Sequence, residues 1–203
     1  MLTQLLLFGA FVAVMILLSV NYNKRTRISF IMDVVYQSPL SEMGFFAMLK
    51  WRLREEHLFE KIELFQPNTA YQNMFDVVYH FDEDIAKNKP KYAVLMLGIN
   101  DVLQENSVNE FAIQFENVCN KLTHLQVKMC VCNLPFRTNN ESVQKIIDEY
   151  NQYFNNYNYG SDFIFINLKK LVVINIHNNE INFSVTDNTN ISETIWRTIR
   201  TLS

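Results

Sequence analysis

Residues 92–101, YAVLMLGIND, decide how the rest of the chain is interpreted. The first six residues are apolar without interruption, which is typical of a strand buried on both faces of a parallel sheet. Gly98, Asn100 and Asp101 then end the strand with residue types that favour turns. In α/β proteins, ligand sites form at the carboxyl ends of such strands. The stretch therefore predicts a buried strand that carries polar groups at its carboxyl end.

Strand-like and helix-like patterns alternate on both sides of this stretch. Further strands are expected at 27–35, 61–65, 127–135 and 162–168, and helices at 41–56, 74–87, 107–122, 141–154 and 191–202. Ser107, followed three residues later by Glu110, predicts a capping box at the start of one helix. Alternating β and α elements favour a parallel sheet with helices on both faces. We expect a three-layer α/β/α, flavodoxin-like domain with a mostly parallel five-stranded sheet.

Polar motifs follow the expected strands in a particular order. Asp33 follows the first strand, Gly98-Ile99-Asn100-Asp101 the third and Asn133-Leu134-Pro135 the fourth, while Asp187 stands just before the expected last helix. This order resembles that of the SGNH, or GDSL-type, hydrolases, a family of flavodoxin-like esterases and acylhydrolases. The resemblance extends over residues 28–202.

The resemblance assigns a role to each motif. In the family, Gly-Asp-Ser follows the first strand, a glycine the second and Gly-x-Asn-Asp the third, and Asp-x-x-His precedes the last helix. The Ser is the nucleophile, the His the general base and the Asp its orienting partner. The Ser amide, the loop glycine amide and the Asn side chain form the oxyanion hole. This chain matches the third motif completely, at Gly98, Asn100 and Asp101.

The other motifs match only in part. Val34 occupies the position of the nucleophile, Asn68 or Thr69 that of the loop glycine, and Asn190 that of the base. A valine side chain has no lone pair with which to attack, and an amide does not accept the proton. The resemblance therefore implies a catalytically degenerate member. Its vestigial site would comprise Asp33, Val34, Gly98, Asn100, Asp101, Asp187 and Asn190.

Three alternatives remain open at this point. Ser38 and His177 could replace the missing nucleophile and base and give a hydrolase of acyl or acetyl esters, although Ser38 lies five residues beyond Asp33. The vestigial cleft could instead bind a small molecule through Asn100 and Asp187. Finally, the Gly-x-Asn-Asp motif could be purely structural, with Asx side chains hydrogen-bonded to backbone amides.

The N-terminal residues indicate a membrane anchor. Residues 1–23 contain no charged side chain, and 5–20 are almost wholly apolar, which is about the length that crosses a bilayer. A cleaved signal peptide would begin with a charged region, which is absent here. The basic segment 24–27 follows, and the positive-inside tendency places the domain, residues 28–203, on the cytosolic side. We expect a single-pass membrane protein.

Net charge and glycine content indicate which ligands and partners the domain is not expected to bind. The net charge is −3 and no long basic run occurs in the domain, so nucleic acid is not an expected partner. Four glycines in 203 residues leave no dinucleotide or P-loop motif, and no cofactor or metal is expected.

Cys119, Cys130 and Cys132 are predicted to be buried apolar residues. We expect a structural or interaction module with a protein partner, and the Asn-rich composition is typical of an AT-rich genome such as that of a large DNA virus.

Overall fold

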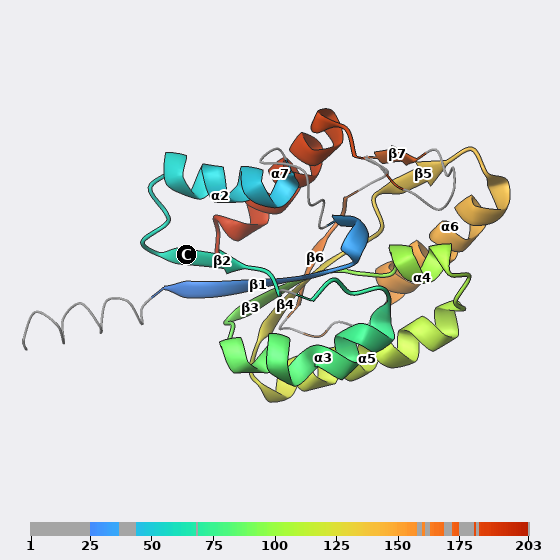
Figure 1. Ribbon diagram of the computed structural model, residues 1–203, viewed down its shortest axis with the longest axis horizontal. Helices are drawn as coiled ribbons and strands as arrows, with labels where there is room; N and C mark the ends of the chain where they lie inside the picture. Colours follow the sequence, from blue (N-terminus) through green and yellow to red (C-terminus); the bar gives the residue numbers. More distant parts are fainter. Residues whose placement is uncertain are drawn as a thin grey trace, which may run out of the picture.

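The computed structural model contains one five-stranded sheet in which every neighbouring pair is parallel (Figure 1). It describes residues 25–36, 44–67, 69–157, 160, 163–168, 172–174, 181 and 183–202. The strand order is β2-β1-β3-β4-β6. This is the flavodoxin-like order, as expected. The strands are β1 (Thr26–Met32), β2 (Ile62–Phe65), β3 (Tyr92–Met96), β4 (Lys128–Cys132) and β6 (Phe163–Ile166).

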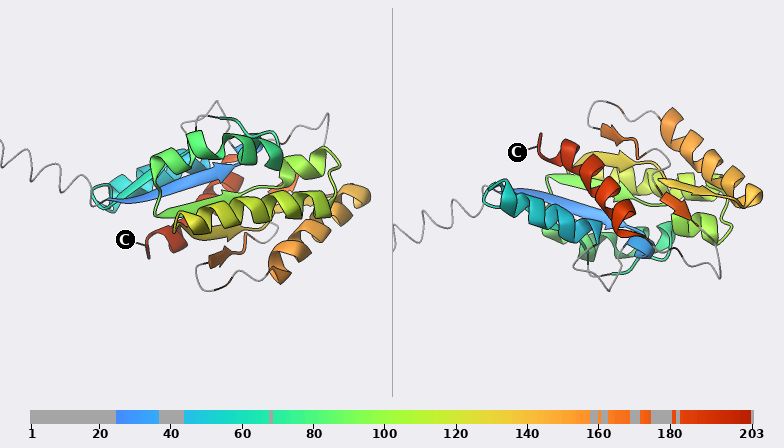
Figure 2. Two further views of the ribbon diagram at one scale, coloured as in Figure 1. Left: turned by 90° about the horizontal axis from the view of Figure 1, so that it is seen from below. Right: turned by 90° about the horizontal axis from the view of Figure 1, so that it is seen from above.

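Helices cover both faces of the sheet and complete the three layers. Figures 1 and 2 show α2 and α7 on one face and α3 and α5 on the other. The α-helices are α2 (Phe45–Glu55), α3 (Met74–Asp84), α4 (Ile99–Leu103), α5 (Val108–His124), α6 (Glu141–Asn156) and α7 (Val185–Ile199), and the short 3-10 helices are η1 (Val34–Tyr36) and η2 (Ala86–Asn88). The predicted α/β/α architecture is confirmed. The Ser107–Glu110 capping box at the start of α5 is also present.

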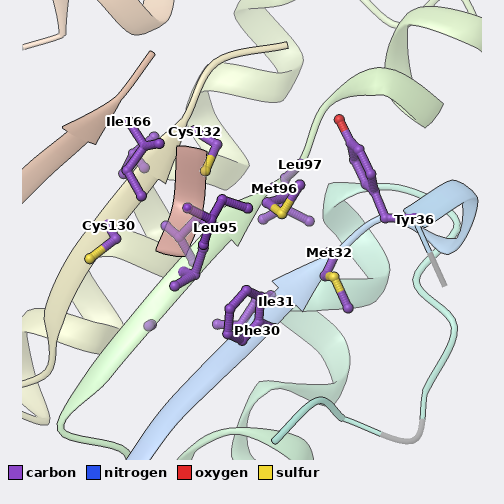
Figure 3. Close-up of a cluster of buried hydrophobic side chains, with 14 of the residues drawn as sticks. Phe30, Ile31, Met32, Tyr36, Leu95, Met96, Leu97, Cys130, Cys132 and Ile166 are labelled. Atoms are coloured by element: carbon purple, nitrogen blue, oxygen red, sulfur yellow. The ribbon is translucent and has the colours of Figure 1, made fainter. Parts of the chain in front are cut away.

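The core consists of the central strands and the helix faces that pack on them. All five residues of β3 are buried, and Figure 3 shows side chains of β1, β3, β4 and β6 gathered in one apolar cluster. Cys119, Cys130 and Cys132 are buried free thiols, as predicted. Burial raises the pKa of Cys130 to about 12, so its thiol stays protonated and unreactive at neutral pH.

One prediction about the elements was wrong, and one small sheet was missed. The last helix begins at Val185 instead of 191, because Ser184 and Asp187 form a capping box that starts the helix earlier. A second, two-stranded parallel sheet was not expected. Its strands, β5 (Phe136–Thr138) and β7 (Val172–Ile174), have three residues each, which is too short to show a period of two.

The predicted anchor, residues 1–23, lies outside the described residues. Ser41, expected to open the first helix, lies outside them as well, and α2 begins at Phe45 with Gly44 at its N-cap. Within the part of the chain that the structure describes, no helix is both long and apolar enough to span a bilayer.

Candidate functional site

Asp33 joins the carboxyl ends of β1 and β3. Its side chain is fully buried, and Oδ2 accepts hydrogen bonds from the amides of Gly98 (2.8 Å) and Asn100 (3.2 Å). Its own amide donates to the carbonyl of Met96 at 3.1 Å. The first and third motifs, 65 residues apart, are thus held together by one carboxyl group.

Gly98 is required by the turn that follows β3. Its φ is 109°, in the region that side chains rarely adopt. A Cβ at this position would lie 3.2 Å from ring atoms of both Phe111 and Tyr150. The glycine therefore serves both the backbone conformation of the turn and the close approach of two aromatic rings.

The carbonyl oxygen of Tyr71 accepts hydrogen bonds from two groups. The family resemblance assigns to both of these groups the binding of an oxyanion. The amide of Val34 donates to it at 2.9 Å, and Nδ2 of Asn100 donates to it at 3.3 Å. Tyr71 is itself fixed, because its ring is fully buried and its hydroxyl donates to Oδ2 of Asp84 at 3.1 Å. Two groups that the family resemblance assigns to the oxyanion hole are therefore hydrogen-bonded to the protein's own backbone.

Asp101 is a structural residue in this arrangement. It is 1% exposed, Oδ2 accepts from the amide of Met74 at 3.3 Å, and Oδ1 accepts from Nδ2 of Asn106 at 3.1 Å. The hydroxyl of Tyr150 donates to the carbonyl of Asn106 at 2.9 Å. The motif after β3 thus connects the start of α3 with the segment between α4 and α5 through Asx hydrogen bonds, as the structural alternative expected, and Tyr150 in the middle of α6 adds a bond to that segment.

Burial dominates the electrostatics of the two carboxyl groups. It raises the pKa of Asp33 to about 8, with a further increase from nearby Asp101, while the amides of Asn100, Gly98 and Ile99 act in the opposite direction. The pKa of Asp101 is also raised, chiefly by burial. At neutral pH Asp33 therefore carries a proton for much of the time, and its Oδ2 is already engaged by the amides of Gly98 and Asn100.

The structure places Asp187 and Asn190 on α7. The sequence predicted Asp187 ahead of the last helix, which was wrong, because it lies in the first turn as part of the capping box. Its Oδ2 accepts from the amide (2.9 Å) and the hydroxyl (2.6 Å) of Ser184. Asn190 is exposed on the next turn. Among the described residues, no hydrogen bond joins either side chain to Asp33 or Asn100.

Asn188, between Asp187 and Asn190, is a buried polar residue of α7. It is 8% exposed, and its Oδ1 accepts from the amide of Phe45 at 3.3 Å, which links the starts of α7 and α2. Ser38, His177 and Asn68 lie outside the described residues, while Thr69 is half-buried in the loop before α3. Within the described ranges, no group of three or more His, Cys, Asp or Glu side chains is placed to hold a metal ion.

Sequence reasoning missed the groups that complete the site. The Tyr71 carbonyl and the Met74 amide belong to the backbone, so no residue type marks them. Asn106 lies five residues after Asp101 and beyond the end of α4, outside the three- or four-residue spacing of helical neighbours, so its spacing gave no signal either.

Comparison with known proteins gives a consistent picture of the fold. No family model and no curated protein sequence matches the chain. Solved structures do match, among them the acetyl xylan esterase AlAXEase (16% identity, TM-score 0.73, 85% of this chain and 99% of that one). TesA matches at 15% identity and a TM-score of 0.72, over 87% of this chain and 99% of its own.

A third match carries the family name. It is a protein assigned to the lipolytic G-D-S-L family from Desulfitobacterium hafniense DCB-2, with 18% identity, a TM-score of 0.65, and coverage of 85% of this chain and 99% of that chain. Together with the strand order and the Gly-x-Asn-Asp turn, these similarities establish the architecture. The chain has the fold of the SGNH, or GDSL-type, esterases.

Proposed function

We propose that this chain is a catalytically inactive SGNH-fold domain that serves as a protein-interaction module on a membrane. The observation that carries the proposal is the pair of hydrogen bonds to the Tyr71 carbonyl. They engage the amide of Val34 and the side chain of Asn100, at the position where the family resemblance assigns the nucleophile and the oxyanion hole.

Ester hydrolysis at this position would lack more than one component. Val34 supplies no nucleophilic oxygen, and the loss of a nucleophile removes most of the rate in the enzymes where this has been measured. Removal of a single oxyanion-hole donor costs about 10²–10³ in kcat. Here two donors face a carbonyl oxygen, and a substrate oxyanion would have to displace it. Inactivity is thus supported by the backbone as well as by the side chains.

The two alternative functions receive less support. A hydrolase that used Ser38 and His177 would still require the donors bound to Tyr71. A small ligand held between Asn100 and Asp187 would have to compete with hydrogen bonds that both side chains already make. An interaction module needs neither rearrangement, and it is compatible with a rigid turn after β3.

The membrane attachment in the proposal rests on residues 1–23. Their apolar composition fits a single-pass anchor, and Lys24, Arg25 and Arg27 favour a cytosolic position for the domain. The composition also suits an AT-rich genome such as that of a large DNA virus. The partner in this proposal is a protein of the same membrane or its cytosolic surface.

The direct test is ester turnover by the purified full chain in detergent. We expect p-nitrophenyl acetate and butyrate to be hydrolysed no faster than in a buffer blank. Ser38→Ala and His177→Ala are matched controls, because neither substitution should change the rate. Turnover above the blank that Ser38→Ala abolishes would refute the inactive assignment.

The interaction part of the proposal needs a separate measurement. Crosslinking in native membranes should join the full chain to one protein partner. Val34→Ser, which restores a hydroxyl at the nucleophile position, should leave that crosslink unchanged. Loss of the crosslink in Val34→Ser would show that the partner depends on the vestigial site.

A further inference from the structure

Aromatic side chains join the first half of α5 to the second half of α6, and the two helices lie side by side (Figure 2). The ring of Phe115 on α5 meets the rings of Tyr153 and Tyr157 nearly edge to face, with centroids 6.0 and 5.8 Å away. The two tyrosine rings also contact each other, at 5.6 Å. Phe115 is fully buried, whereas both tyrosines are half-buried. The core therefore holds the tyrosine rings in place while part of each reaches the surface.

These two rings belong to a groove of about 790 Å³ between the helices. Ligand sites commonly have volumes of about 300–1,000 Å³. Besides the tyrosines, the lining comprises Val108 and four polar side chains, which are Glu116, Glu149, Gln152 and Asn156. None of the described residues that line this groove carries a positive charge. We call this set of seven residues the α5–α6 groove.

The segments that form the groove are strongly acidic. Residues 105–124 and 141–157 contain two lysines, Lys121 and Lys145, no arginine, and six acidic residues, which are Glu105, Glu110, Glu116, Glu141, Asp148 and Glu149. Lys121 lies over the ring of Phe81 on α3, with Nζ 4.9 Å from its centroid. Lys145 pairs with Glu149 at 4.0 Å, but both side chains are more than half exposed, and such a pair contributes little. The lysines thus compensate only part of the negative charge.

The carboxylate of Glu116 lies beside the tyrosine rings. Burial raises the pKa of Tyr157 to about 12, and the nearby Cys119 and Glu116 add to this increase. Glu116 is exposed, and within the described part of the chain it makes no hydrogen bond or ion pair. Its oxygens are therefore available to a ligand in the groove.

Carboxylates beside tyrosine rings match the chemistry of a guanidinium group. The planar guanidinium of arginine stacks on aromatic faces and donates paired hydrogen bonds to a carboxylate. The side-chain oxygens of Gln152 and Asn156 can accept further hydrogen bonds from it. A lysine ammonium is more strongly hydrated and has no plane with which to stack. An anionic partner would be repelled by Glu116 and Glu149, which come from different helices.

We infer that the α5–α6 groove binds an arginine side chain in a basic segment of the partner protein. This inference rests on the interaction role proposed above and names the chemistry of the partner. The α5–α6 groove shares no lining residue with the vestigial site. Binding there leaves the hydrogen bonds to the Tyr71 carbonyl in place, as expected for a partner that does not use the site.

The tyrosines of the groove supply the readout for a test. The full chain is labelled with fluorotyrosine in nonionic detergent, and the fluorine NMR signals of the two groove tyrosines are identified with Tyr153→Phe and Tyr157→Phe. The probes are the peptide acetyl-Gly-Arg-Gly-amide, its lysine analogue and its citrulline analogue. Citrulline keeps the shape of arginine without its charge.

The arginine peptide should shift both signals saturably and bind at least about threefold more tightly than the lysine peptide and about tenfold more tightly than the citrulline peptide. Glu116→Gln and Glu149→Gln should each weaken its binding about two- to fivefold, as expected for exposed ion pairs, and the double variant more. Glu141→Gln removes an acid of α6 that does not line the groove, and this matched control should bind normally. Unchanged signals from the other tyrosines would show that each variant is folded.

Three results of the titration would overturn the inference: no saturable shift with the arginine peptide, equal affinity for the citrulline peptide, or full affinity in the double variant. Equal affinity for the lysine peptide would overturn the assignment of arginine.

Crosslinking in native membranes separates failure of this inference from failure of the interaction role. Loss of the partner crosslink in the Glu116→Gln and Glu149→Gln double variant, with the crosslink kept in Glu141→Gln, would support the inference. If the double variant keeps the crosslink, the partner docks elsewhere and the inference is overturned. If the wild-type chain binds the arginine peptide but forms no crosslink, the interaction role is refuted while the groove stands as a guanidinium site.

Discussion

Substitution of Asp33 tests how the turn after β3 is held. In Asp33→Ala the amides of Gly98 and Asn100 lose their acceptor inside a fully buried site. A buried donor without a partner costs about 1–3 kcal/mol, so two of them predict a loss of about 2–6 kcal/mol in the free energy of unfolding. Asp33→Asn keeps an acceptor oxygen of the same shape and should lose less.

The same residue predicts a particular pH dependence. The pKa of Asp33 in the folded protein is raised to about 8 by burial and by Asp101. Above about pH 4 the unfolded chain releases this proton while the folded protein keeps it, so stability is greatest at acidic pH and falls as pH rises toward 8. One pH unit corresponds to about 1.4 kcal/mol, so between pH 5 and 8 this group removes up to about 4 kcal/mol. Asp33→Asn lacks this contribution, and its stability should fall less over the same interval.

Urea unfolding followed by circular dichroism at pH 5, 6, 7 and 8 measures both effects. The expected order of stability at pH 5 is wild type, then Asp33→Asn, then Asp33→Ala, and the gap between wild type and Asp33→Asn should narrow or reverse by pH 8. Equal stability of Asp33→Ala and Asp33→Asn would refute the role of the carboxyl group as an acceptor for the two amides. Parallel pH profiles for wild type and Asp33→Asn would refute the raised pKa.

Further substitutions test the turn and the start of the last helix. Gly98→Ala should lower the free energy of unfolding by about 2–4 kcal/mol in urea titrations, because it combines a positive φ with crowding against Phe111 and Tyr150, whereas Gly160→Ala, with a φ of 62° and nothing within 4 Å, should lose only about 1–2 kcal/mol. Equal losses at the two glycines would contradict the packing argument. Ser184→Ala should cost about 1 kcal/mol by removing the α7 capping box, and no change in its thermal unfolding midpoint would mean that the cap contributes nothing.

The sheet could be predicted from sequence because its strands are unusually clear. Residues 92–97 are apolar without interruption and lie in the centre of the sheet, where both faces are covered. The Ser107–Glu110 pair marks the start of α5 in the same unambiguous way. By contrast, the start of α7 depends on Ser184 and Asp187, a capping signal that was overlooked because Asp187 had been assigned to a catalytic motif.

The sequence could predict the parts of the candidate site that depend on residue type, but not the parts formed by backbone atoms. Gly98, Asn100 and Asp101 stand where the motif placed them, and Asp33 makes the contact that joins the first motif to the third. The decisive group, the Tyr71 carbonyl, is a backbone atom whose position follows from the buried Tyr71 ring and its bond to Asp84. No local pattern predicts such an arrangement, because it depends on how the loop before α3 packs against the end of β1.

The most direct test of whether this domain is catalytically inactive is intact-mass spectrometry of the full chain after incubation with a fluorophosphonate probe. We predict no covalent adduct, because Val34 provides no nucleophile and the oxyanion donors are bound to the Tyr71 carbonyl. A single stoichiometric adduct that maps to Ser38, or to any other serine at the carboxyl edge of the sheet, would contradict catalytic inactivity and show that this domain is an active hydrolase.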